Sequence, residues 1–361
     1  MLEKKINFKK IVFFTGARSD FSILEDVIKK FLPYKNIKIY LYVSGIHTLK
    51  EFGFSKKLIQ NHRKVLKKTI SIYGKKNNYT KKKLLFIIKK IQKELSIDKP
   101  DIIYILGDRF EAMGASLAAK SLNIPIIHSG GGDNTPGSKD DFYRDTISKL
   151  SQLIFATNQS SYKRLKKKFK NKIIRFSGSP VISKIYHYKK IKKNKKKLKF
   201  ALLTFHPTEN LKENIHKVME KIISYLIYIN MNVLITYPNN EAGCYKIIKV
   251  IKKFAKDKRI EIYKNLGKLY FEKLDQCEFL IGNSSSGIIE APYFNKPFIN
   301  VGKRQFNRDH DTNVISTGIN LKKIKQSIDK FKTQKKIRNN FIFGKINACE
   351  IQKKEILKFL S

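Results

Sequence analysis

The chain has 361 residues, of which 42% are hydrophobic, and this is enough for two domains of ordinary size. Its formal net charge of +47 would suit a nucleic-acid-binding protein, but the lysines are spread along the whole chain and no nucleic-acid-binding motif accompanies them. We therefore expect solvated basic faces without a specific nucleic-acid surface, and a general attraction for anionic substrates.

Short apolar runs alternate with longer amphipathic segments, a pattern typical of parallel sheets with crossover helices. In the first half, strands are expected at 11–15, 37–43, 102–106, 124–127, 153–156 and 173–176, and helices at 21–32, 79–95, 110–122 and 160–169. A stretch at 189–199 is nearly all lysine and predicts a solvated linker. Alternation then restarts, with strands at 200–204, 233–236, 260–263, 279–281 and 298–301, and helices at 212–227, 245–255, 287–294 and 348–360.

Two successive α/β halves predict two Rossmann-like domains, whose parallel sheets flank a central cleft. The expected domains are residues 1–185 and 196–340, and the remaining segment, 341–361, is expected to be a helix that packs back on the first domain. Ligands of such sheets bind beyond the carboxyl ends of the strands. The residues that follow each strand are therefore the candidate site residues.

The cysteines and the apolar runs predict a cytoplasmic protein. Cys244, Cys277 and Cys349 are far apart and share no metal-ligand spacing, which suits a reducing compartment without disulfides. The apolar run at 11–14 is too short for a signal sequence, and no run approaches the ~20 residues of a membrane span. We expect no membrane partner.

Polar residues follow the first two strands. Arg18, within Thr-Gly-Ala-Arg-Ser-Asp at 15–20, is a candidate contact for a diphosphate or a sugar, and Ser19 or Asp20 is expected to cap the next helix. The alternative is a plain turn from strand to helix, and the GxGxxG fingerprint of dinucleotide-binding folds is missing here. His47 follows the second strand, where a structural histidine is the more common finding.

A carboxylate and a guanidinium follow the strand at 102–106. Asp108 and Arg109 suit sugar hydroxyls or proton transfer. The alternative is a capping box, with Asp108 as the N-cap and Glu111 three residues later, and both interpretations can hold together.

The most unusual segment follows the strand at 124–127. It contains Gly130, Gly131 and Gly132, which let the backbone approach a ligand closely, and four carboxylates within thirteen residues. Clustered carboxylates raise each other's pKa, as a base that abstracts a proton from a sugar C2 would need. The alternative is a glycine loop leading into a helix whose N-terminus favours Asp140 and Asp141.

The second half has polar strand ends of its own. His206 follows one strand and could neutralise phosphate charge or transfer a proton, and Asn239 follows the next within Tyr-Pro-Asn. Serine hydroxyls and N–H groups at the start of a helix predict an anion site, and Glu290 lies one turn further on, where a ribose diol could bind. This candidate site comprises Asn283, Ser284, Ser285, Ser286 and Gly287. Arg304 and Arg308 follow at the same edge, with surface charge as the alternative.

These motifs together resemble the hydrolysing UDP-N-acetylglucosamine 2-epimerases of the sialic and legionaminic acid pathways. The resemblance runs in order from Lys10 to about Leu360. It is carried by Thr-Gly-Ala-Arg-Ser-Asp (15–20), Ser-Gly-Ile-His with Glu-Phe-Gly (44–47, 51–53), Gly-Asp-Arg-Phe-Glu (107–111), Tyr-Pro-Asn (237–239) and Gly-Asn-Ser-Ser-Ser-Gly-Ile-Ile-Glu-Ala-Pro (282–292). The Asn-Ser-Ser-Ser-Gly block, with Arg304 and Arg308, is its most specific part.

The resemblance implies a GT-B architecture, a homodimer, a UDP-sugar substrate held by its UDP mainly in the second domain, and a reaction without metal, NAD or another cofactor. It implies that Asp108, Asp133 and Asp140 are catalytic carboxylates and that His206 and Arg18 face the diphosphate and the reacting sugar. UDP-binding positions are Ser285, Ser286 and Glu290. The wider set of implied substrate contacts adds His47, Arg109, Asn239, Asn283, Ser284, Gly287 and Arg304.

Three departures lie in and beside the glycine loop. The family usually has His-Ile-His-Gly-Gly-Glu, whereas this chain has Gly130 at the second histidine and Asp133 at the glutamate, and Asp145 stands where a histidine is usual. Alternatives to the hydrolysing reaction are a non-hydrolysing 2-epimerase, a GT-B glycosyltransferase, which the acid cluster disfavours, and a non-catalytic nucleic-acid-binding protein.

Overall fold

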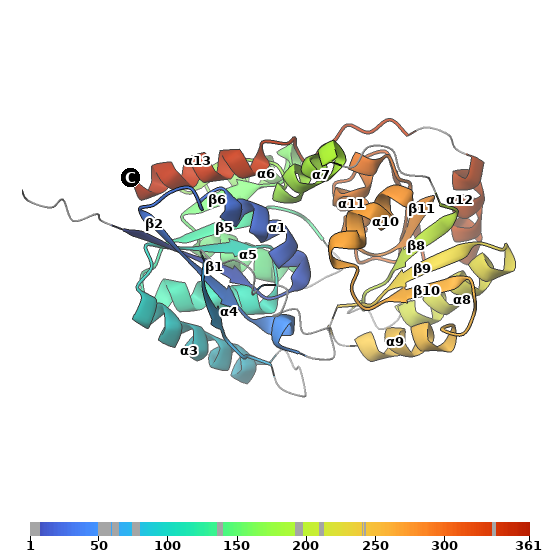
Figure 1. Cartoon of the computed structure of the whole chain (residues 1–361), viewed down its shortest axis with the longest axis horizontal. Helices are drawn as coiled ribbons and strands as arrows, with labels where there is room; N and C mark the ends of the chain where they lie inside the picture. The colour runs from blue at the N-terminus through green and yellow to red at the C-terminus, as the bar shows by residue number, and fades with distance from the viewer. Residues whose placement is uncertain are drawn as a thin grey trace, which may run out of the picture. The chain divides into compact units, whose positions relative to one another are not determined.

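The chain forms two compact α/β units, each with its own core (Figure 1). The computed structural model describes residues 8–49, 59, 65–73, 80–135, 140–191, 198–208, 213–239, 241, 243–333 and 337–361, with the backbone alone for Arg18, Lys332 and Thr333. The first unit combines the described residues up to Asp133 with Asp140–Lys184 and Phe343–Ser361, and the second is built mainly from Ile185–Ile342.

The first unit contains a parallel sheet of seven strands in the order β3-β2-β1-β4-β5-β6-β7. In chain order these are β1 (Lys9–Thr15), β2 (Ile37–Val43), β3 (Leu66–Thr69), β4 (Ile102–Leu106), β5 (Ile126–Gly131), β6 (Leu153–Ala156) and β7 (Ile173–Phe176). From β1 the chain adds β2 and β3 on one side, and then β4 to β7 on the other side. The carboxyl ends of the adjacent strands β1 and β4 therefore lie at the switch point of the strand order, where such sheets bind ligands.

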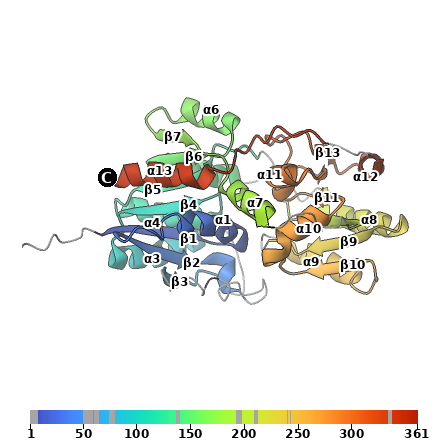
Figure 2. The same ribbon diagram turned by 45° about the horizontal axis from the view of Figure 1, so that its top comes forward.

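Helices cover both faces of this sheet (Figure 2). They are α1 (Arg18–Lys29), α3 (Lys81–Asp98), α4 (Phe110–Ser121), α5 (Asp140–Leu150), α6 (Gln159–Lys168) and α13 (Ala348–Leu360). Helix α7 (Pro180–Ile191) begins in this unit, and its residues from Ile185 belong to the second unit. Alternate side chains of β1 point to opposite faces: Ile11 and Phe13 pack with residues of α1 and α13, and Val12 and Phe14 pack with residues of α3 and α4. The C-terminal helix is thus part of the first core.

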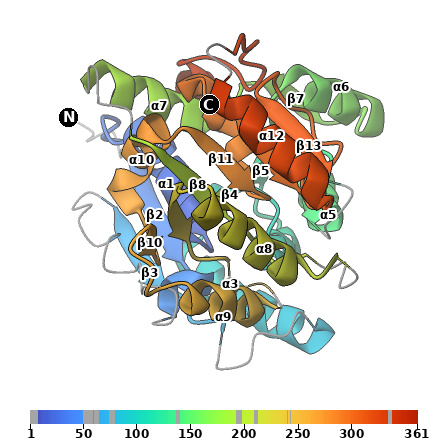
Figure 3. The same cartoon turned by 90° about the vertical axis from the view of Figure 1, so that its right-hand side faces the viewer.

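The second unit contains a six-stranded parallel sheet in the order β10-β9-β8-β11-β12-β13 (Figure 3). The strands are β8 (Phe200–Thr204), β9 (Asn232–Thr236), β10 (Ile260–Tyr263), β11 (Phe279–Gly282), β12 (Phe298–Val301) and β13 (Val314–Gly318). The helices are α8 (Ile215–Tyr228), α9 (Cys244–Lys253), α10 (Tyr270–Gln276), α11 (Ser286–Ile289) and α12 (Leu321–Thr333). Apolar side chains of α8, α9 and α12 pack against β8 and β9 in one cluster.

The predicted fold class is confirmed, because two α/β units with parallel sheets follow one another as in GT-B proteins. The expected domain limits at 185, 196 and 340 stay predictions. Among the described residues, none of the helices is long and apolar enough to cross a membrane.

Several predicted segments have other bounds in the structure, and three of these differences are informative. The strand expected at 124–127 begins at Ile126, because Pro125 has no N–H for the ladder, and it continues into the glycines as far as Gly131. The helix expected at 287–294 ends at Ile289, and a 3-10 turn at Ala291–Phe294 contains Pro292, which cannot continue an α-helix. The linker was expected to begin at residue 189, but α7 continues to Ile191. Residues 192–197 of the expected linker lie outside the described residues.

Candidate functional site

His47 supports the turn that joins β1 to α1. Its Nε2 lies 2.9 Å from the Thr15 hydroxyl, which gives its own proton to the Ala17 carbonyl at 3.1 Å, so the imidazole N–H is the donor. The His47 side chain is fully buried. Gly45, at φ +60°, has no room for a side chain, because an added Cβ would lie 2.2 Å from the Gly16 carbonyl oxygen. These contacts give His47 a structural role, and its contact with substrate stays a prediction.

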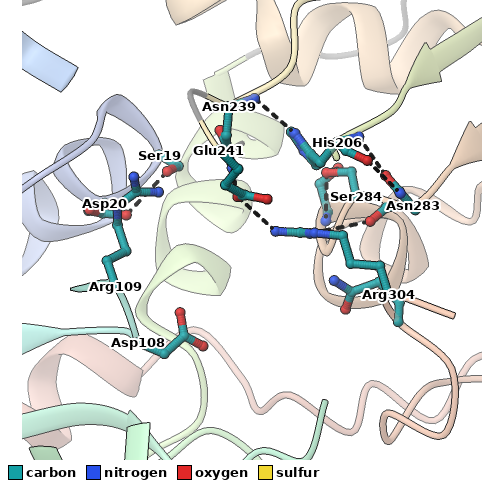
Figure 4. A network of polar contacts seen from close by, with 12 residues as sticks. Ser19, Asp20, Asp108, Arg109, His206, Asn239, Glu241, Asn283, Ser284 and Arg304 are labelled. Atoms are coloured by element: carbon teal, nitrogen blue, oxygen red, sulfur yellow. Dashed lines mark hydrogen bonds and ion pairs between the residues drawn. The ribbon is translucent and has the colours of Figure 1, made fainter. Parts of the chain in front are cut away.

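The predicted cap of α1 is wrong. Ala17 occupies the N-cap without a side-chain hydrogen bond, and Ser19 and Asp20 lie inside the first turn, where Ser19 donates to Asp20 Oδ1 at 3.2 Å. Burial raises the pKa of Asp20 to about 6, against the opposing charge of Arg109 (Figure 4). The backbone of Arg18 begins α1. Its side chain lies outside the described residues, as does Glu-Phe-Gly at 51–53.

Arg109, rather than Asp108, is the N-cap residue of α4, so the predicted capping box is wrong. Glu111 is 1% exposed and accepts from Arg109 Nε at 2.6 Å on one oxygen and from the Tyr73 hydroxyl at 2.8 Å on the other. A Cβ on Gly16 would lie 2.4 Å from the Glu111 carboxylate. Glu111 therefore orients Arg109 instead of capping the helix.

Arg144 lies at the centre of the predicted acid cluster. Its guanidinium is 1% exposed and pairs with the carboxylates of Asp108, which follows β4, and Asp141, one turn earlier in α5. Burial lowers the pKa of Arg144, but the charges of the neighbouring aspartates raise it by more, so the net shift is upward. The sequence analysis considered the mutual repulsion of the acids and did not include Arg144. The signal that could have found it is the spacing of three residues between Asp141 and Arg144, which suits an ion pair on a helix.

The other acids of the cluster have different surroundings. Asp140 is the first residue of α5 and is half-buried. Asp133 accepts from the hydroxyls of Thr157 at 2.9 Å and Ser161 at 2.7 Å, and its backbone carbonyl accepts from Arg144 at 2.9 Å. Asp145 is half-exposed, with 43% of its side chain accessible, and pairs with Lys168. The structure therefore brings Asp108, Asp133 and Asp141 around Arg144, with Asp145 on the surface.

His128, in the middle of β5, connects this strand to the turn after β4. Its Nε2 lies 2.8 Å from the Gly107 carbonyl, which can only accept, so Nε2 carries the proton and Nδ1 accepts from Ser148 at 2.9 Å. Burial lowers its pKa to about 4. This neutral imidazole fixes the backbone just before Asp108. Gly130, at φ +95°, lies at a register shift where β5 meets β6, and a positive φ there favours glycine.

In the second unit, Asn283 links the ends of two neighbouring strands, β8 and β11 (Figure 4). Its side-chain oxygen accepts from the His206 N–H at 2.7 Å, and its amide nitrogen donates to the His206 carbonyl at 2.9 Å. His206 Nδ1 accepts from the Asn239 N–H at 3.1 Å, so a neutral His206 carries its proton on Nε2. Both Asn283 and His206 are buried.

Arg304 is 9% exposed, which excludes the alternative of simple surface charge for this residue. Its guanidinium donates to Glu241 at 3.2 Å and to the Asn283 carbonyl at 3.4 Å, and Glu241 also accepts from the Asn239 side chain at 3.3 Å. Glu241 was missed by the sequence reasoning. Arg308 contacts Gln305 at 3.0 Å.

The serine-rich turn lies directly after Asn283. Ser284 and Ser286 share a hydrogen bond of 3.2 Å, Ser285 is the N-cap of α11, and all three serines are half-buried. Gly287 has a packing reason to be glycine, because an added Cβ would lie 2.4 Å from the ring of Phe298. Glu290 ends α11, and its charge adds to burial in raising the pKa of Tyr270. The turn, Arg304 and His206 thus lie together at the ends of β8 and β11.

The fold and these strand-end residues define a two-unit α/β protein of the GT-B class. The profile of the family described as UDP-N-acetylglucosamine 2-epimerase matches residues 29–357. The chain belongs to this family.

Curated relatives match most of the chain. A UDP-N,N'-diacetylbacillosamine 2-epimerase (hydrolyzing) of Legionella pneumophila is 28% identical over 348 residues, with 93% of this chain and 92% of the relative covered. A UDP-N-acetylglucosamine 2-epimerase of Neisseria meningitidis is 28% identical, with 89% and 86% covered. A GDP/UDP-N,N'-diacetylbacillosamine 2-epimerase (hydrolyzing) of Campylobacter jejuni is 28% identical, with 86% and 85% covered.

Solved structures share the fold. The Methanocaldococcus jannaschii UDP-GlcNAc 2-epimerase in complex with UDP-GlcNAc and UDP superposes with a TM-score of 0.81 at 19% identity, covering 97% of this chain and 99% of that one. The Neisseria meningitidis UDP-GlcNAc 2-epimerase bound to UDP-GlcNAc gives 0.76 at 18% identity, covering 97% and 100%.

Proposed function

We propose that this protein is a hydrolysing UDP-sugar 2-epimerase. It would convert UDP-N-acetylglucosamine, or a UDP-2,4-diacetamido-6-deoxy sugar, into UDP and the free 2-epimer, an N-acetylmannosamine type of sugar. The observation that carries this proposal is the group of carboxylates around Arg144, which follows strands β4 and β5 at the carboxyl edge of the first sheet. Two of the similar relatives are named as hydrolysing enzymes.

The reaction proceeds in two stages. A carboxylate removes the proton from C2 while the C1–O bond breaks, and the electron pair leaves with UDP, giving a 2-acetamidoglucal. Water then adds its oxygen at C1, and C2 takes a proton on the opposite face. Carboxylates suit both proton transfers, and cationic or N–H groups stabilise the charge that develops on the departing diphosphate.

The first unit would act on the sugar. Asp108, Asp133 and Asp140 are the proposed catalytic carboxylates. Buried Arg144 compensates the charge of Asp108 and Asp133, which would otherwise oppose bringing these two together. Glu111 holds Arg109 for a sugar contact. Arg18 is proposed to meet the sugar or diphosphate from the start of α1, close to the turn that His47 supports.

The second unit would bind UDP. Arg304 and the serines 284–286 supply a cation, hydroxyls and N–H groups for the diphosphate, and Glu290 is the proposed contact for the ribose diol. His206, held by Asn283, would neutralise charge on the leaving group or transfer a proton. Asn239 completes this set through its hydrogen bond to His206.

The test is product analysis by NMR on a panel of UDP-sugars, together with measurement of UDP release. The expected result is stoichiometric UDP and a free 2-epimer from one member of the panel. No UDP release from any member would contradict the proposal. A change from Asp108 to Asn should lower kcat at least about 100-fold, whereas Asp145→Asn, on the exposed side of α5, should leave it unchanged.

A non-hydrolysing 2-epimerase is the second candidate, and it is favoured by one observation. The Neisseria relative is as similar as the hydrolysing ones, and its name does not specify hydrolysis. A recovered UDP-mannosamine product, with UDP still attached, would identify this reaction in the same NMR experiment. We further propose a homodimer that serves sialic or legionaminic acid synthesis. Light scattering of the purified protein would test the dimer.

A further inference from the structure

Two hydroxyl groups, one in the turn between β6 and α6 and one in the first turn of α6, hold the carboxylate of Asp133. Thr157 Oγ1 lies 2.9 Å, and Ser161 Oγ 2.7 Å, from the same oxygen, Oδ1. An ionised carboxylate can only accept, so both hydroxyls donate. Thr157 is 7% exposed and Ser161 is fully buried, so water competes little for these two bonds.

The segment that carries these hydroxyls, the turn before α6 and the first turn of α6, is itself held by hydrogen bonds. Asn158 is the N-cap of α6 and accepts from the Ser161 N–H at 2.7 Å. Arg164, one turn later, donates to the Ser161 hydroxyl at 3.1 Å and to the Gly132 carbonyl at 2.7 Å. Ser161 therefore receives one hydrogen bond and gives another, which sets the direction of its O–H toward Asp133.

The backbone beside Asp133 is packed against the same turn. Gly132 has φ +79°, and a Cβ there would lie 2.6 Å from the Ser161 carbonyl oxygen. On the other side, Arg144 holds the Asp133 carbonyl. Because both the main chain and the side chain of Asp133 are held, the position of its carboxylate is set by the length of its side chain.

We propose that Thr157 and Ser161 are positioning residues for Asp133, and that this site is built for the length of an aspartate side chain and not for that of a glutamate. This inference rests on the proposed function, because it assigns the role to a carboxylate of that site. One added methylene would move the carboxylate by about 1 Å, past the two hydroxyls, and a displacement of that size in a catalytic group is costly.

The test compares steady-state kinetics of variants with the UDP-sugar that the wild-type protein consumes. Thr157→Val and Ser161→Ala are expected to lower kcat about 10-fold or more and to leave the Kd for UDP within about twofold of the wild type. Asp133→Glu is expected to lose at least about 10-fold in kcat, and to regain part of it when Thr157 is also replaced by Ala, which makes room for the methylene.

Ser160→Ala is the matched control, because Ser160 is exposed in the same first turn of α6. It should behave like the wild type. Full activity of Thr157→Val and Ser161→Ala, or an Asp133→Glu variant as active as the wild type, would overturn the proposal.

A second measurement does not depend on the reaction. The free energy of unfolding is measured by urea denaturation for Thr157→Val in two backgrounds, the wild type and an Asp133→Ala variant. The loss should be clearly larger in the wild type, because the hydrogen bond between Thr157 and Asp133 exists only there. Equal losses in the two backgrounds would overturn the proposed contact. If Thr157→Val costs more stability in the wild type than in the Asp133→Ala variant, but no UDP is released from any UDP-sugar, the contact stands and the proposed function is contradicted.

Discussion

The side chain of Asn283 makes two hydrogen bonds to the backbone of His206, one to its N–H and one to its carbonyl. This pairing imitates one step of a strand ladder, and it continues the contact between β11 and β8 beyond the last paired residues, Gly282 and Thr204. His206 is therefore held at its backbone by one strand end and at its imidazole by the Asn239 N–H.

Replacing Asn283 by Asp should disturb His206 without changing size. An ionised Asp can accept from the His206 N–H but cannot donate to its carbonyl, so the carbonyl of this buried residue would lose the hydrogen bond that Asn283 gives it. We expect a loss of about 1–3 kcal/mol in unfolding free energy, measured by urea denaturation, together with lower kcat. Asn265→Asp is the control, since Asn265 accepts locally in an exposed loop. Unchanged stability would contradict the assigned pair of bonds.

Replacing Arg144 by Lys should show that the fork of the guanidinium matters in addition to its charge. A lysine ammonium cannot bridge Asp108, Asp141 and the Asp133 carbonyl in the same geometry. We expect a loss of about 2–4 kcal/mol in stability and a strong decrease in UDP release. Arg175→Lys, at a half-exposed ion pair with Glu355, is the matched control and should cost less than about 1 kcal/mol. Equal effects of the two substitutions would contradict this prediction.

His128 should make the protein less stable in mild acid. Burial lowers its folded pKa to about 4 from 6.5, so between these values the unfolded chain binds a proton that the folded chain does not. Stability from this group is complete above about pH 6.5 and falls as pH decreases toward 4, by about 3 kcal/mol in total. Urea denaturation of His128→Asn should show a shallower pH slope than the wild type in this window. An unchanged pH slope in the His128→Asn variant would contradict the lowered pKa of His128.

Asp20 should affect the pH dependence of stability in the opposite direction to His128, because its folded-state pKa is raised. Its folded pKa is raised from 3.8 to about 6, so the folded chain binds the extra proton between these values. The stability that Asp20 provides is present below about pH 4 and is lost as pH rises through 6. Asp20→Asn should therefore be more stable than the wild type by about 1–3 kcal/mol at neutral pH, and the difference should vanish near pH 3.5. A constant difference across this range would contradict the shifted pKa.

Gly282 should be intolerant of any side chain. At φ +144°, an added Cβ would lie 1.9 Å from the Thr204 carbonyl oxygen. Gly282 and Thr204 are paired residues of adjacent strands, so the two backbones cannot move apart without breaking the sheet. We expect Gly282→Ala to be recovered poorly from the soluble fraction. Gly267→Ala is the control, because Gly267 has φ +51° and an added Cβ would have no neighbour within 4 Å. It should cost only about 1 kcal/mol in unfolding free energy.

Much of the strand pattern was predictable, because fully buried parallel strands are short apolar runs between polar segments. Strands at 37–43, 102–106, 153–156, 173–176, 200–204, 260–263 and 298–301 have the predicted bounds. The elements missed in the two units are β3, α7, α10, α12 and β13. Of these, β3 has a weak pattern, since it reads Leu-Lys-Lys-Thr with half-buried or exposed side chains.

The sequence by itself determined the alternation of strands and helices, the glycine-lined segment rich in acids and the serine-rich turn, because hydrophobic period and residue type are local properties. Only the tertiary structure decided that Arg144 lies among the acids, that Thr157 and Ser161 hold Asp133, and that Glu111 orients Arg109 instead of capping a helix. The contacts of Arg144 with Asp108, and of Thr157 and Ser161 with Asp133, join separate turns of one sheet edge. Their partners are chosen by strand order and register, which no local pattern encodes.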